Sequence, residues 1–402
     1  MSDKSLTAYI QSAKINRELG PIRPPSEFDS LLLRVVRNCT WNRCLFCPLY
    51  DQENFDKRNV QEVLTEIDDI SREIQNIIKW DGHIRHTKST RTTDFSPGAK
   101  ISKHTVSSLY SINSSLSQIA YWLYMGGKKV FLQDADALVI PPHELITILN
   151  HISNKLPTVT NITCYSRSKT LTNRDSSDLS KFQLAGLSRI HMGLESGNDQ
   201  VLKLMNKGVS TKEQIAGGIK TVSSGITLTM YVILGLGGRE LSKEHAKDTA
   251  YVINQVNPNF VRLRTLSIPP NGPLHRLITE GEFTPLNDDE IITEQRELIK
   301  NLNCNTFLTC DHRLNLFEGL KGQLPVQKQS LIKYIDSYLS MPFEKRLNYQ
   351  LGRRMGVYRN LSDMSRISLY QQVSNKIDDL GGYDYPDAIE RHIEQLKQRL
   401  LL

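Results

Sequence analysis

The strongest constraint on the fold is a regular alternation of short apolar segments with amphipathic ones between residues 31 and 266. Strands are predicted at Leu31–Arg37, Lys129–Leu132, Asn161–Tyr165, Arg189–Gly193, Thr227–Leu234 and Phe260–Leu266. Helices are predicted between them, at Val60–Ile78, Leu116–Met125, Pro142–Lys155, Ser176–Ala185, Asp199–Ser223 and Lys243–Val256. Such alternation favours parallel strands joined by right-handed crossovers.

The glycine-rich segment after the fifth predicted strand decides between a barrel and an open dinucleotide-binding sheet. Gly235-Leu-Gly-Gly238 is not a dinucleotide loop, because Glu240 occupies the third glycine position. Six β/α units without that fingerprint favour a barrel. The sequence therefore predicts an α/β fold with a partial (β/α)6 TIM-like barrel and a helical C-terminal extension.

Three regions are expected along the chain. An N-terminal segment covers residues 1–29, the barrel core covers 30–280 with an insertion at about 79–115, and a mostly helical extension covers 281–402. Within the insertion, Lys79–Ser108 carries six Lys or Arg and two Asp and is rich in Ser and Thr, which predicts a long surface loop. Such a loop either covers the open end of the barrel, where its positive charge would favour an anionic substrate, or is an idle surface feature.

Composition bounds the function classes only loosely. The chain has 402 residues, 39% of them hydrophobic, which suffices for a sizeable core. Its formal charge of +7 suits an anionic ligand, RNA or merely a charged surface. Residues 1–20 are polar and unlike a secretory signal, and no apolar stretch approaches the length of a membrane span. The expectation is a cytoplasmic protein without a membrane segment.

Three of the six cysteines, Cys39, Cys44 and Cys47, lie within nine residues directly after the first predicted strand. Thiolates select zinc, copper(I) or iron–sulfur clusters. A structural zinc site usually has four ligands, yet no Cys or His follows between Pro48 and Gly82. Three close cysteines suit a [4Fe–4S] cluster that leaves one iron without a protein ligand. Zinc binding and buried structural thiols are the alternatives.

The other cysteines, Cys164, Cys304 and Cys310, are expected to be free thiols. The five residues between Cys304 and Cys310 match no common ligand spacing, and Phe307 and Leu308 between them indicate a packed segment. A second cluster on these three residues is the alternative.

The cysteine loop resembles that of the radical SAM superfamily, in which three cysteines are spaced by three and then two residues with an aromatic before the last. Phe46 matches that aromatic, and four residues instead of three separate Cys39 from Cys44. His191-Met-Gly-Leu-Glu-Ser-Gly197 resembles the branch that contains oxygen-independent coproporphyrinogen oxidases and methylthiotransferases. Asp311-His-Arg-Leu-Asn315 and Gly322-Gln-Leu-Pro325 resemble the C-terminal signature of a poorly characterised group of such proteins.

The resemblance implies a set of S-adenosylmethionine contacts at the ends of the predicted strands. They are Phe46 in the cysteine loop, Gln133, Asp134 and Asp136 for the methionyl amino group, Ser166 and Arg167 for the ribose or carboxylate, Glu195, and Leu236 beside the adenine. Each has a structural alternative: a turn and helix cap for the two aspartates, a solvated strand end for Ser166 and Arg167, and a cap near Asn198 for Glu195. His191 is either a catalytic polar group beside the substrate radical or a satisfied core residue.

The function implied by the resemblance is reductive cleavage of S-adenosylmethionine at a [4Fe–4S] cluster, giving a 5′-deoxyadenosyl radical that acts on an unknown substrate. The expected partners are a small-molecule or peptide substrate, with an anionic one favoured, and an electron donor such as flavodoxin or ferredoxin. A zinc-stabilised RNA-binding protein and a catalytically retired barrel acting as a carrier or chaperone are the alternatives. Against RNA binding, the sequence has no basic motif interleaved with aromatics.

Overall fold

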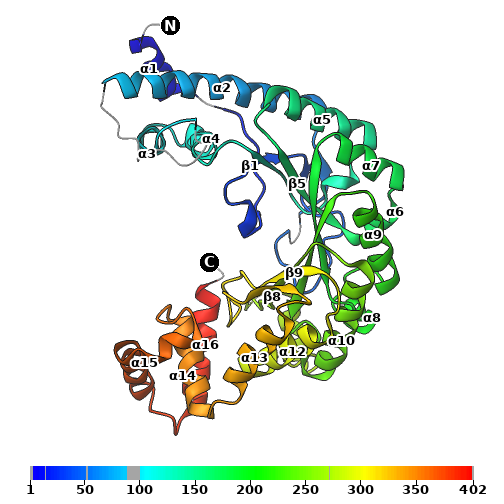
Figure 1. The fold of residues 1–402 in the computed structure, drawn as a ribbon, viewed down its shortest axis with the longest axis vertical. Coiled ribbons are helices and arrows are strands. Elements are labelled where there is room, and N and C mark those ends of the chain that lie inside the picture. The colour runs from blue at the N-terminus through cyan, green and yellow to red at the C-terminus, as the bar shows by residue number, and fades with distance from the viewer. Residues whose placement is uncertain (1–2, 14, 51–52, 88–99, 271, 401–402) are drawn as a thin grey trace. The chain divides into compact units, whose positions relative to one another are not determined.

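The computed structural model describes residues 3–13, 15–50, 53–87, 100–270 and 272–400 (Figure 1). The chain divides into two compact units, which are considered separately below. The first comprises Met1–Asn42, Leu49–His191 and Ser223–Thr227, and the second comprises Arg43–Pro48, Met192–Val222 and Leu228–Leu402. The cysteine loop thus contributes Cys39 to the first unit and Cys44 and Cys47 to the second.

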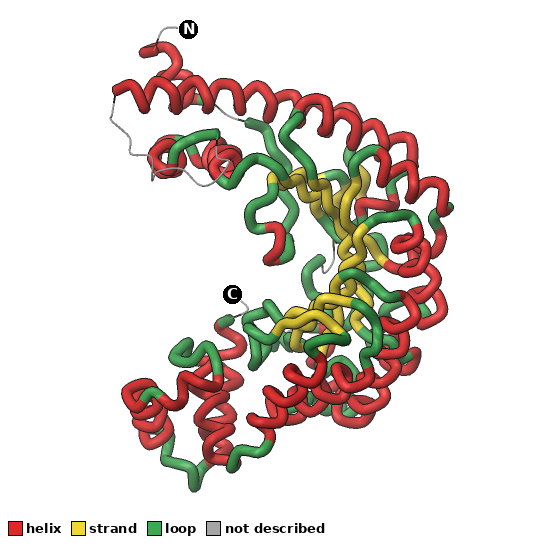
Figure 2. The backbone as a smooth tube through the Cα atoms, in the orientation of Figure 1, coloured by secondary structure: helices red, strands yellow, loops and turns green. Residues whose placement is uncertain are grey.

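The first unit alternates strands with helices. Its strands are β1 (Leu31–Arg34), β2 (Val36–Arg37), β3 (Asp56–Lys57), β4 (Lys129–Gln133), β5 (Asn161–Arg167) and most of β6 (Leu187–Glu195). Its helices are α1 (Asp3–Ser12), η1 (Pro25–Glu27), α2 (Val60–Thr87), α3 (Lys103–Ile112), α4 (Ser114–Tyr124), η3 (Ala137–Val139), α5 (Pro142–Lys155), α6 (Ser168–Asn173) and α7 (Ser176–Leu184). Helix α5 packs between α2 and α7, and the three lie along one side of the strands (Figure 2).

The second unit continues the alternation and ends in helices. Its strands are β7 (Thr227–Leu234), β8 (Phe260–Thr265), β9 (Thr306–Thr309) and β10 (Lys321–Leu324). Its helices are α8 (Asp199–Leu204), α9 (Thr211–Ser223), α10 (Gly238–Val256), α11 (Pro273–Thr279), α12 (Asp288–Asn301), α13 (Lys328–Leu339), α14 (Phe343–Arg354), η4 (Leu361–Ser365), α15 (Ile367–Asp379) and α16 (Pro386–Arg399). Helix α12 packs between α10 and α13.

The main sheet has eight strands in the order β1-β4-β5-β6-β7-β8-β9-β10, and β2 pairs with β3 separately. Strands β1, β4 and β5 are parallel, as are β7, β8 and β9, whereas β10 runs antiparallel to β9. The sheet is open, with β1 and β10 at its edges, which confirms the prediction of an α/β fold built as a partial barrel. All six predicted strands are present, and the hairpin of β9 and β10 is an addition.

Two sequence-based expectations were wrong in detail, and a third was right but incomplete. Lys79–Ser108 is not one long loop, because α2 extends to Thr87 and α3 begins at Lys103; its central residues lie outside the described part. Asp199–Ser223 is two helices, separated where Asn206 and Gly208 adopt left-handed backbone angles that end a helix. The segment after residue 280 is mostly helical but contains β9 and β10.

The helix α3 forms because its first turn is anchored by a buried carboxylate. Ser102 caps the helix by accepting from the backbone N–H of Thr105, and the Asp81 carboxylate accepts from both hydroxyls, at 2.8 and 2.6 Å. This buried network joins α3 to α2 and offsets the modest helix propensity of the Ser- and Thr-rich segment. None of the helices in the described part of the chain is both long and apolar enough to cross a membrane.

Candidate cluster loop and cofactor site

The three cysteines of the loop are more exposed than the other three cysteines of the chain. None of the six cysteines, all of which the structure describes, forms a disulfide. Cys39, Cys44 and Cys47 are partly exposed, whereas the other three are buried. Within the second unit, the Cys47 N–H donates to the Cys44 carbonyl at 3.1 Å. Neighbouring Leu45 donates to the Met205 carbonyl, also at 3.1 Å, which fixes this half of the loop to the end of α8.

The longer first spacing of the loop is accommodated by Asn42. This residue has a φ of 44°, a left-handed angle that asparagine tolerates better than most residues. Its side-chain amide donates to the Tyr50 carbonyl and, at 3.0 Å, to the Glu53 carbonyl. Asn42, between the first two cysteines, is therefore tied to the segment after the loop.

The loop fits an iron–sulfur cluster by the chemistry of its side chains, although these side chains are not arranged around a common metal position. Within the described ranges, no group of three or more His, Cys, Asp and Glu side chains is arranged to hold a metal ion. The loop nevertheless supplies three accessible thiols of the soft type that iron–sulfur clusters require. Cys39, Cys44 and Cys47 would be the ligands, with no fourth cysteine in the loop.

Asp134 fastens the cysteine loop. Its carboxylate is fully buried and accepts hydrogen bonds from Arg34 Nε at 2.5 Å, from the Asn38 backbone N–H at 3.2 Å and from the Tyr50 hydroxyl at 3.0 Å. Asn38 immediately precedes the first cysteine, and Tyr50 follows the last by three residues. A Cβ on Gly20 would lie 2.5 Å from the Asp134 carboxylate, so the N-terminal segment also closes over it. These contacts make Asp134 a positioning residue for the loop.

The predicted cofactor contact Gln133 is engaged by the N-terminal segment. Its side-chain oxygen accepts from the Gly20 N–H at 2.9 Å, and its nitrogen donates to the carbonyls of Gly20 and Ile22, each at 3.1 Å. The Gln133 side chain thus hydrogen-bonds the backbone of this segment as a neighbouring strand would. Its role as a contact to S-adenosylmethionine stays a prediction.

Asp136 joins the ends of β4 and β5 to the first half of the cysteine loop. Its buried carboxylate accepts from Ser166 Oγ at 2.9 Å, Thr170 Oγ1 at 2.5 Å and Thr40 Oγ1 at 3.3 Å. Burial raises the pKa of Asp136, and the hydrogen bonds partly oppose this. The helix-cap alternative for Asp136 was wrong, because its side chain caps no hydrogen bond of η3.

Arg167 brings a positive charge to the same place. Its guanidinium carbon lies 5.4 Å from the centre of the Trp41 ring, and its Nη1 is 3.5 Å from Thr40 Oγ1. Both partners lie in the loop just after Cys39. In the first unit, the structure therefore brings Asp136, Ser166 and Arg167 together beside the first cysteine, as the strand-end prediction required.

Glu195 occupies the equivalent place in the second unit. It has a φ of 63° and accepts a hydrogen bond from Lys207 Nζ at 3.1 Å. The same Lys207 Nζ lies 5.6 Å from the centre of the Phe46 ring, which puts the pair beside the cysteine loop. A Cβ on Gly193 would lie 2.2 Å from the Glu195 carboxylate, so a larger residue there would displace the Glu195 side chain. The cap alternative was wrong for Glu195, because Asn198 itself caps α8.

The segment after Glu195 is held by α10. Ser196 Oγ lies 2.8 Å from His245 Nδ1, and the Gly197 N–H donates to Thr249 Oγ1 at 2.8 Å. A Cβ on Gly197 would lie 2.4 Å from the Asp248 carbonyl oxygen, so a larger residue would force the backbone apart. The Gly-Leu-Glu-Ser-Gly motif therefore fixes where Glu195 leaves its strand.

His191 is buried and paired through its Nε2 with Glu27 in this structure. It is fully buried, and its Nε2 lies 3.1 Å from Glu27 Oε1. Its ring lies among Phe131 and Tyr165, with centroid distances of 6.2 and 5.6 Å. Burial raises the pKa of Glu27, but hydrogen bonds from His191 and Ser30 outweigh it and the net pKa is lowered. The core interpretation fits these contacts, and a catalytic role for His191 stays a prediction.

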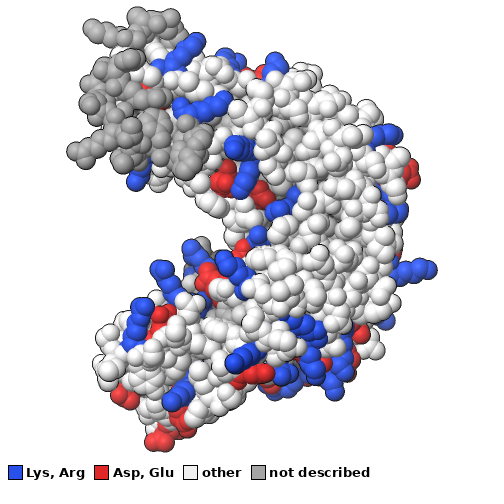
Figure 3. Space-filling model, in the orientation of Figure 1, with Lys and Arg blue, Asp and Glu red and all other residues white. Residues whose placement is uncertain are grey.

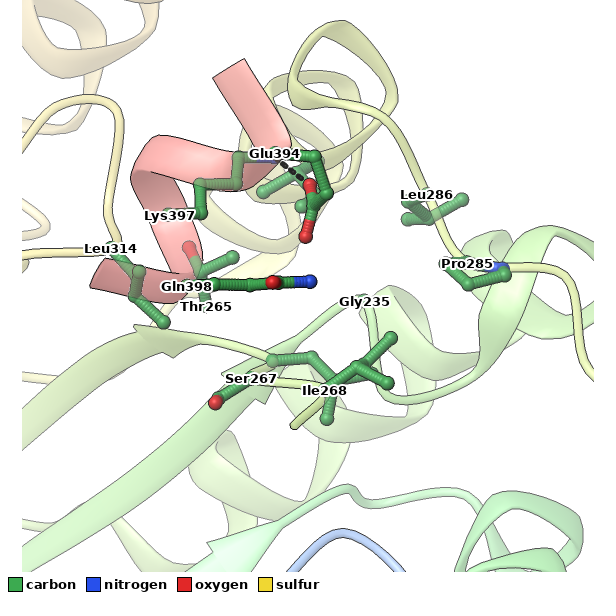
Figure 4. A pocket seen from close by; sticks show the side chains of 12 residues that line it. Gly235, Thr265, Ser267, Ile268, Pro285, Leu286, Leu314, Glu394, Lys397 and Gln398 are labelled. Carbon is green, nitrogen blue, oxygen red and sulfur yellow. Dashed lines mark ion pairs between the residues drawn. The ribbon is translucent and has the colours of Figure 1, made fainter. Parts of the chain in front are cut away.

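The predicted adenine side of the site is apolar and nearly closed. Leu236 is fully buried in a cluster with Val201, Met205, Leu274, Leu277 and Phe283, hereafter the Leu236 cluster, and Leu45 and Phe46 pack against it. Beside it, a cavity of about 50 Å³ lies at the ends of β7 and β8. Figure 4 shows Glu394, Lys397 and Gln398 of α16 facing Ser267 and Ile268 across it. That volume holds about one or two water molecules, so an adenosine would not fit without movement of these side chains.

The remaining cysteines differ chemically from those of the loop. Burial raises the pKa of Cys164 and Cys310, and it raises the pKa of Cys304 to about 11. Cys310 Sγ accepts from the Gln295 side chain at 3.1 Å. These surroundings suit inert thiols, as expected from the sequence, and the absence of a second cluster stays a prediction.

Sequence reasoning missed several residues that contact the predicted site residues or lie among them. They are Thr40 and Trp41 inside the cysteine loop, Thr170 on α6, Lys207 after α8 and Glu27 in η1. Only Thr40 and Trp41 carried a signal, because they lie between two predicted ligands. Lys207 could not be found, since its pairing depends on the turn between α8 and α9.

Comparisons with known proteins find a short sequence similarity and distant structural similarities. No protein-family model matches the chain. Over 88 residues the chain is 34% identical to a tRNA-2-methylthio-N(6)-dimethylallyladenosine synthase of Syntrophus aciditrophicus (strain SB). That match covers 20% of this chain and 19% of the other, so it spans about a fifth of each protein.

Two solved structures are similar at low identity. The radical S-adenosylmethionine methyltransferase TsrM from Kitasatospora setae, with cobalamin and a [4Fe–4S] cluster bound, is 11% identical with a TM-score of 0.43, over 68% of this chain and 42% of that one. The radical SAM enzyme coproporphyrinogen III oxidase (HemN) from Escherichia coli is 12% identical with a TM-score of 0.42, over 75% and 55%. These structural values are too low to carry an argument about chemistry. The sequence match confirms the resemblance to methylthiotransferases.

Proposed function

We propose that the protein is a radical SAM enzyme that holds a [4Fe–4S] cluster on Cys39, Cys44 and Cys47 and binds S-adenosylmethionine at the open iron. The observation that carries the proposal is the set of three partly exposed thiols within nine residues, flanked by charged side chains at strand ends. When bound, the reduced cluster supplies the electron that cleaves S-adenosylmethionine to methionine and a 5′-deoxyadenosyl radical.

The residues of this chain would orient the cofactor. Arg167 presents a guanidinium beside Trp41, which suits a carboxylate, and Glu195 presents a carboxylate beside Phe46, which suits an ammonium group. Asp134 would hold the cysteine loop in place through both of its ends. The apolar side chains around Leu236 would exclude water from the reacting atoms.

The remaining partners follow from this chemistry. The proposed enzyme needs a substrate that gives up a hydrogen atom and a reductant, of which flavodoxin and ferredoxin are examples. No observation on the described residues supports the alternatives of a zinc-stabilised RNA-binding protein or a carrier. Figure 3 shows Lys and Arg interspersed with Asp and Glu on the face in view, where RNA binding would favour a basic stripe.

Anaerobic reconstitution with iron and sulfide tests the proposal. The protein should bind about four iron ions per chain. After reduction with S-adenosylmethionine present, it should form 5′-deoxyadenosine, measured by mass spectrometry. Stoichiometric tight zinc, together with no iron-dependent absorbance after reconstitution, would overturn the proposal in favour of a structural metal site.

Glu195→Ala is expected to weaken S-adenosylmethionine binding by about ten- to a hundredfold in the cluster-loaded protein. A charge-assisted hydrogen bond to the methionyl ammonium is worth roughly 1.5–3 kcal/mol, and its loss also leaves Lys207 without its partner carboxylate. Equilibrium dialysis with labelled cofactor measures the effect, and iron content shows that the cluster is intact.

The matched control is Glu240→Ala, which removes an exposed carboxylate of the same unit from α10. It should bind S-adenosylmethionine as the unmodified chain does. Equal affinities for the Glu195 and Glu240 variants would show that Glu195 does not contact the cofactor.

A further inference from the structure

Two arginines share one face of β8 in the second unit. Along the strand, Phe260, Arg262 and Arg264 are partly exposed, whereas the residues between them are buried and point to the other face. Arg262 lies opposite Tyr231 of β7, and Arg264 lies opposite Ile233. Because side chains point to alternate faces of a strand, the two guanidinium groups lie on the same side of the sheet.

The surroundings of these arginines form a polar cluster of five residues, Tyr231, Arg262, Arg264, Asp311 and His312, hereafter the arginine cluster. The Arg264 guanidinium carbon lies 4.6 Å from the centre of the Tyr231 ring. Arg262 Nη1 donates to the Asp311 carboxylate. Asp311 and His312 follow β9 closely, so the cluster is built from three adjacent strands.

Arg262 Nε and His312 Nδ1 are buried polar atoms that have no hydrogen-bond partner among the described residues. Buried polar atoms are almost always hydrogen-bonded in folded proteins, because an unsatisfied one costs about 1–3 kcal/mol. Two such atoms beside a pair of guanidinium groups indicate a place where a ligand completes the hydrogen bonding.

The charge of the cluster favours an anion. Burial lowers the pKa of His312 to about 4, and the positive charges of Arg264 and Arg354 act in the same direction, against Asp311 and Glu318. His312 is therefore neutral at pH 7. Within the arginine cluster, two guanidinium groups then face a single carboxylate. Arginine's planar fork suits carboxylate and phosphate groups, which accept two parallel hydrogen bonds.

The arginine cluster and the cysteine loop are connected through the Leu236 cluster. Ile233, which is opposite Arg264 in the sheet register, packs against the Leu236 cluster. Leu45 and Phe46 pack against that same cluster. Within the second unit, Arg264 is therefore the register partner of a residue that packs against the same apolar cluster as Leu45 and Phe46.

We propose that Arg262, Arg264 and His312 bind an anionic group, a carboxylate or a phosphate, of the substrate. The assignment of this anion to a substrate rests on the proposed function. The presence of an anion-binding site does not depend on that function. Tyr231 positions the Arg264 guanidinium over its ring, and Asp311 orients Arg262 through their ion pair. The substrate class is thereby narrowed to anionic molecules.

Isothermal titration of the full chain with inorganic phosphate and, separately, with succinate tests the proposal. At least one anion should bind saturably, and the stronger of the two identifies the group. Arg264→Gln and Arg262→Gln should each weaken that binding about tenfold or more, because each removes a charge-assisted hydrogen bond. Arg239→Gln is the matched control, since Arg239 is an exposed arginine of α10 paired with Glu290, and it should bind as the unmodified chain does.

Two results would overturn the inference: no saturable binding of either anion, or equal binding by the Arg264→Gln variant and the control. If Arg264→Gln does not fold, as judged by its melting curve, Arg264→Lys replaces it. Lysine keeps the charge but loses the planar fork, so binding should still weaken. Iron content and 5′-deoxyadenosine formation are measured on the same preparations. Normal cofactor cleavage without anion binding rejects this inference alone, whereas anion binding without cleavage rejects only the proposed function.

Discussion

Replacing any one of Cys39, Cys44 and Cys47 with alanine is expected to abolish cluster binding and 5′-deoxyadenosine formation together. Each residue would supply one of three thiolates, and the loop contains no fourth cysteine that could substitute. Loss of one ligand from a three-cysteine set leaves a second iron without a protein ligand, so the cluster should not survive purification. Iron analysis, visible absorbance and mass spectrometry of the reaction products measure the outcome.

The control for these variants is the double replacement Cys304→Ala and Cys310→Ala. Both thiols are buried, and burial raises the pKa of each, so neither is suited to bind iron. Iron content should match that of the unmodified chain. Loss of about half the iron in the control would reveal a second cluster. Retention of iron in all three loop variants would refute the cluster assignment.

Arg354→Met is expected to destabilise the second unit by about 3–5 kcal/mol, the range for breaking a buried ion pair from one side. Arg354 Nη2 lies 3.0 and 3.1 Å from the two carboxylate oxygens of Asp288, and both side chains are almost fully buried. Its Nη1 also donates to the Leu314 carbonyl at 2.9 Å. Methionine fills a similar volume but leaves the Asp288 charge with only Lys397 as a described cationic partner, at 3.0 Å.

Urea unfolding followed by circular dichroism measures this loss. Arg239→Met serves as the control, because it removes a surface arginine whose pairing with Glu290 is exposed. Its unfolding midpoint should stay close to that of the unmodified chain. Equal midpoints for the two variants would show that the buried pair does not stabilise the fold.

The same group predicts a dependence of stability on pH. Burial alone would raise the pKa of Asp288, but the charges of Arg354 and Lys397 lower it from 3.8 to about 2. A folded-state pKa below the unfolded value gives stability that is present above about pH 4 and lost as the pH falls towards 2. The difference corresponds to about 2 kcal/mol. Arg354→Met should remove most of this acid-sensitive component.

The parts of the fold that the sequence predicted are those set by local periodicity. Helix α5 has the predicted bounds, and the six expected strands appear in order. Helix α3 was missed because it depends on Asp81, which reaches Ser102 and Thr105 from 21 and 24 residues away. Strand β9 was missed because four residues between helices give too short a pattern, and its place is set by pairing with β8.

For the candidate site too, local sequence patterns predicted some residues, and tertiary contacts determined the rest. Because parallel strands present their ends at one edge of the sheet, residues at those ends were expected to lie close together. This was correct for Asp136, Ser166 and Arg167. The sequence could not show that the Asp134 carboxylate accepts hydrogen bonds from Arg34 and Tyr50, because these contacts come from side-chain packing. Nor could it find the arginine cluster, whose members are far apart in the sequence and meet only through the register of β7, β8 and β9.

The ion pairs around Asp288 also have a consequence for how the protein is made. Asp288 emerges from the ribosome well before Arg354 and Lys397, its two cationic partners. Until both have been synthesised, burying that carboxylate would leave its charge uncompensated, so α12 cannot settle into its final packing. Lys397 also belongs to α16, which faces the ends of β7 and β8. The nascent second unit should therefore stay open to proteases, and available to chaperones, until synthesis has passed residue 397.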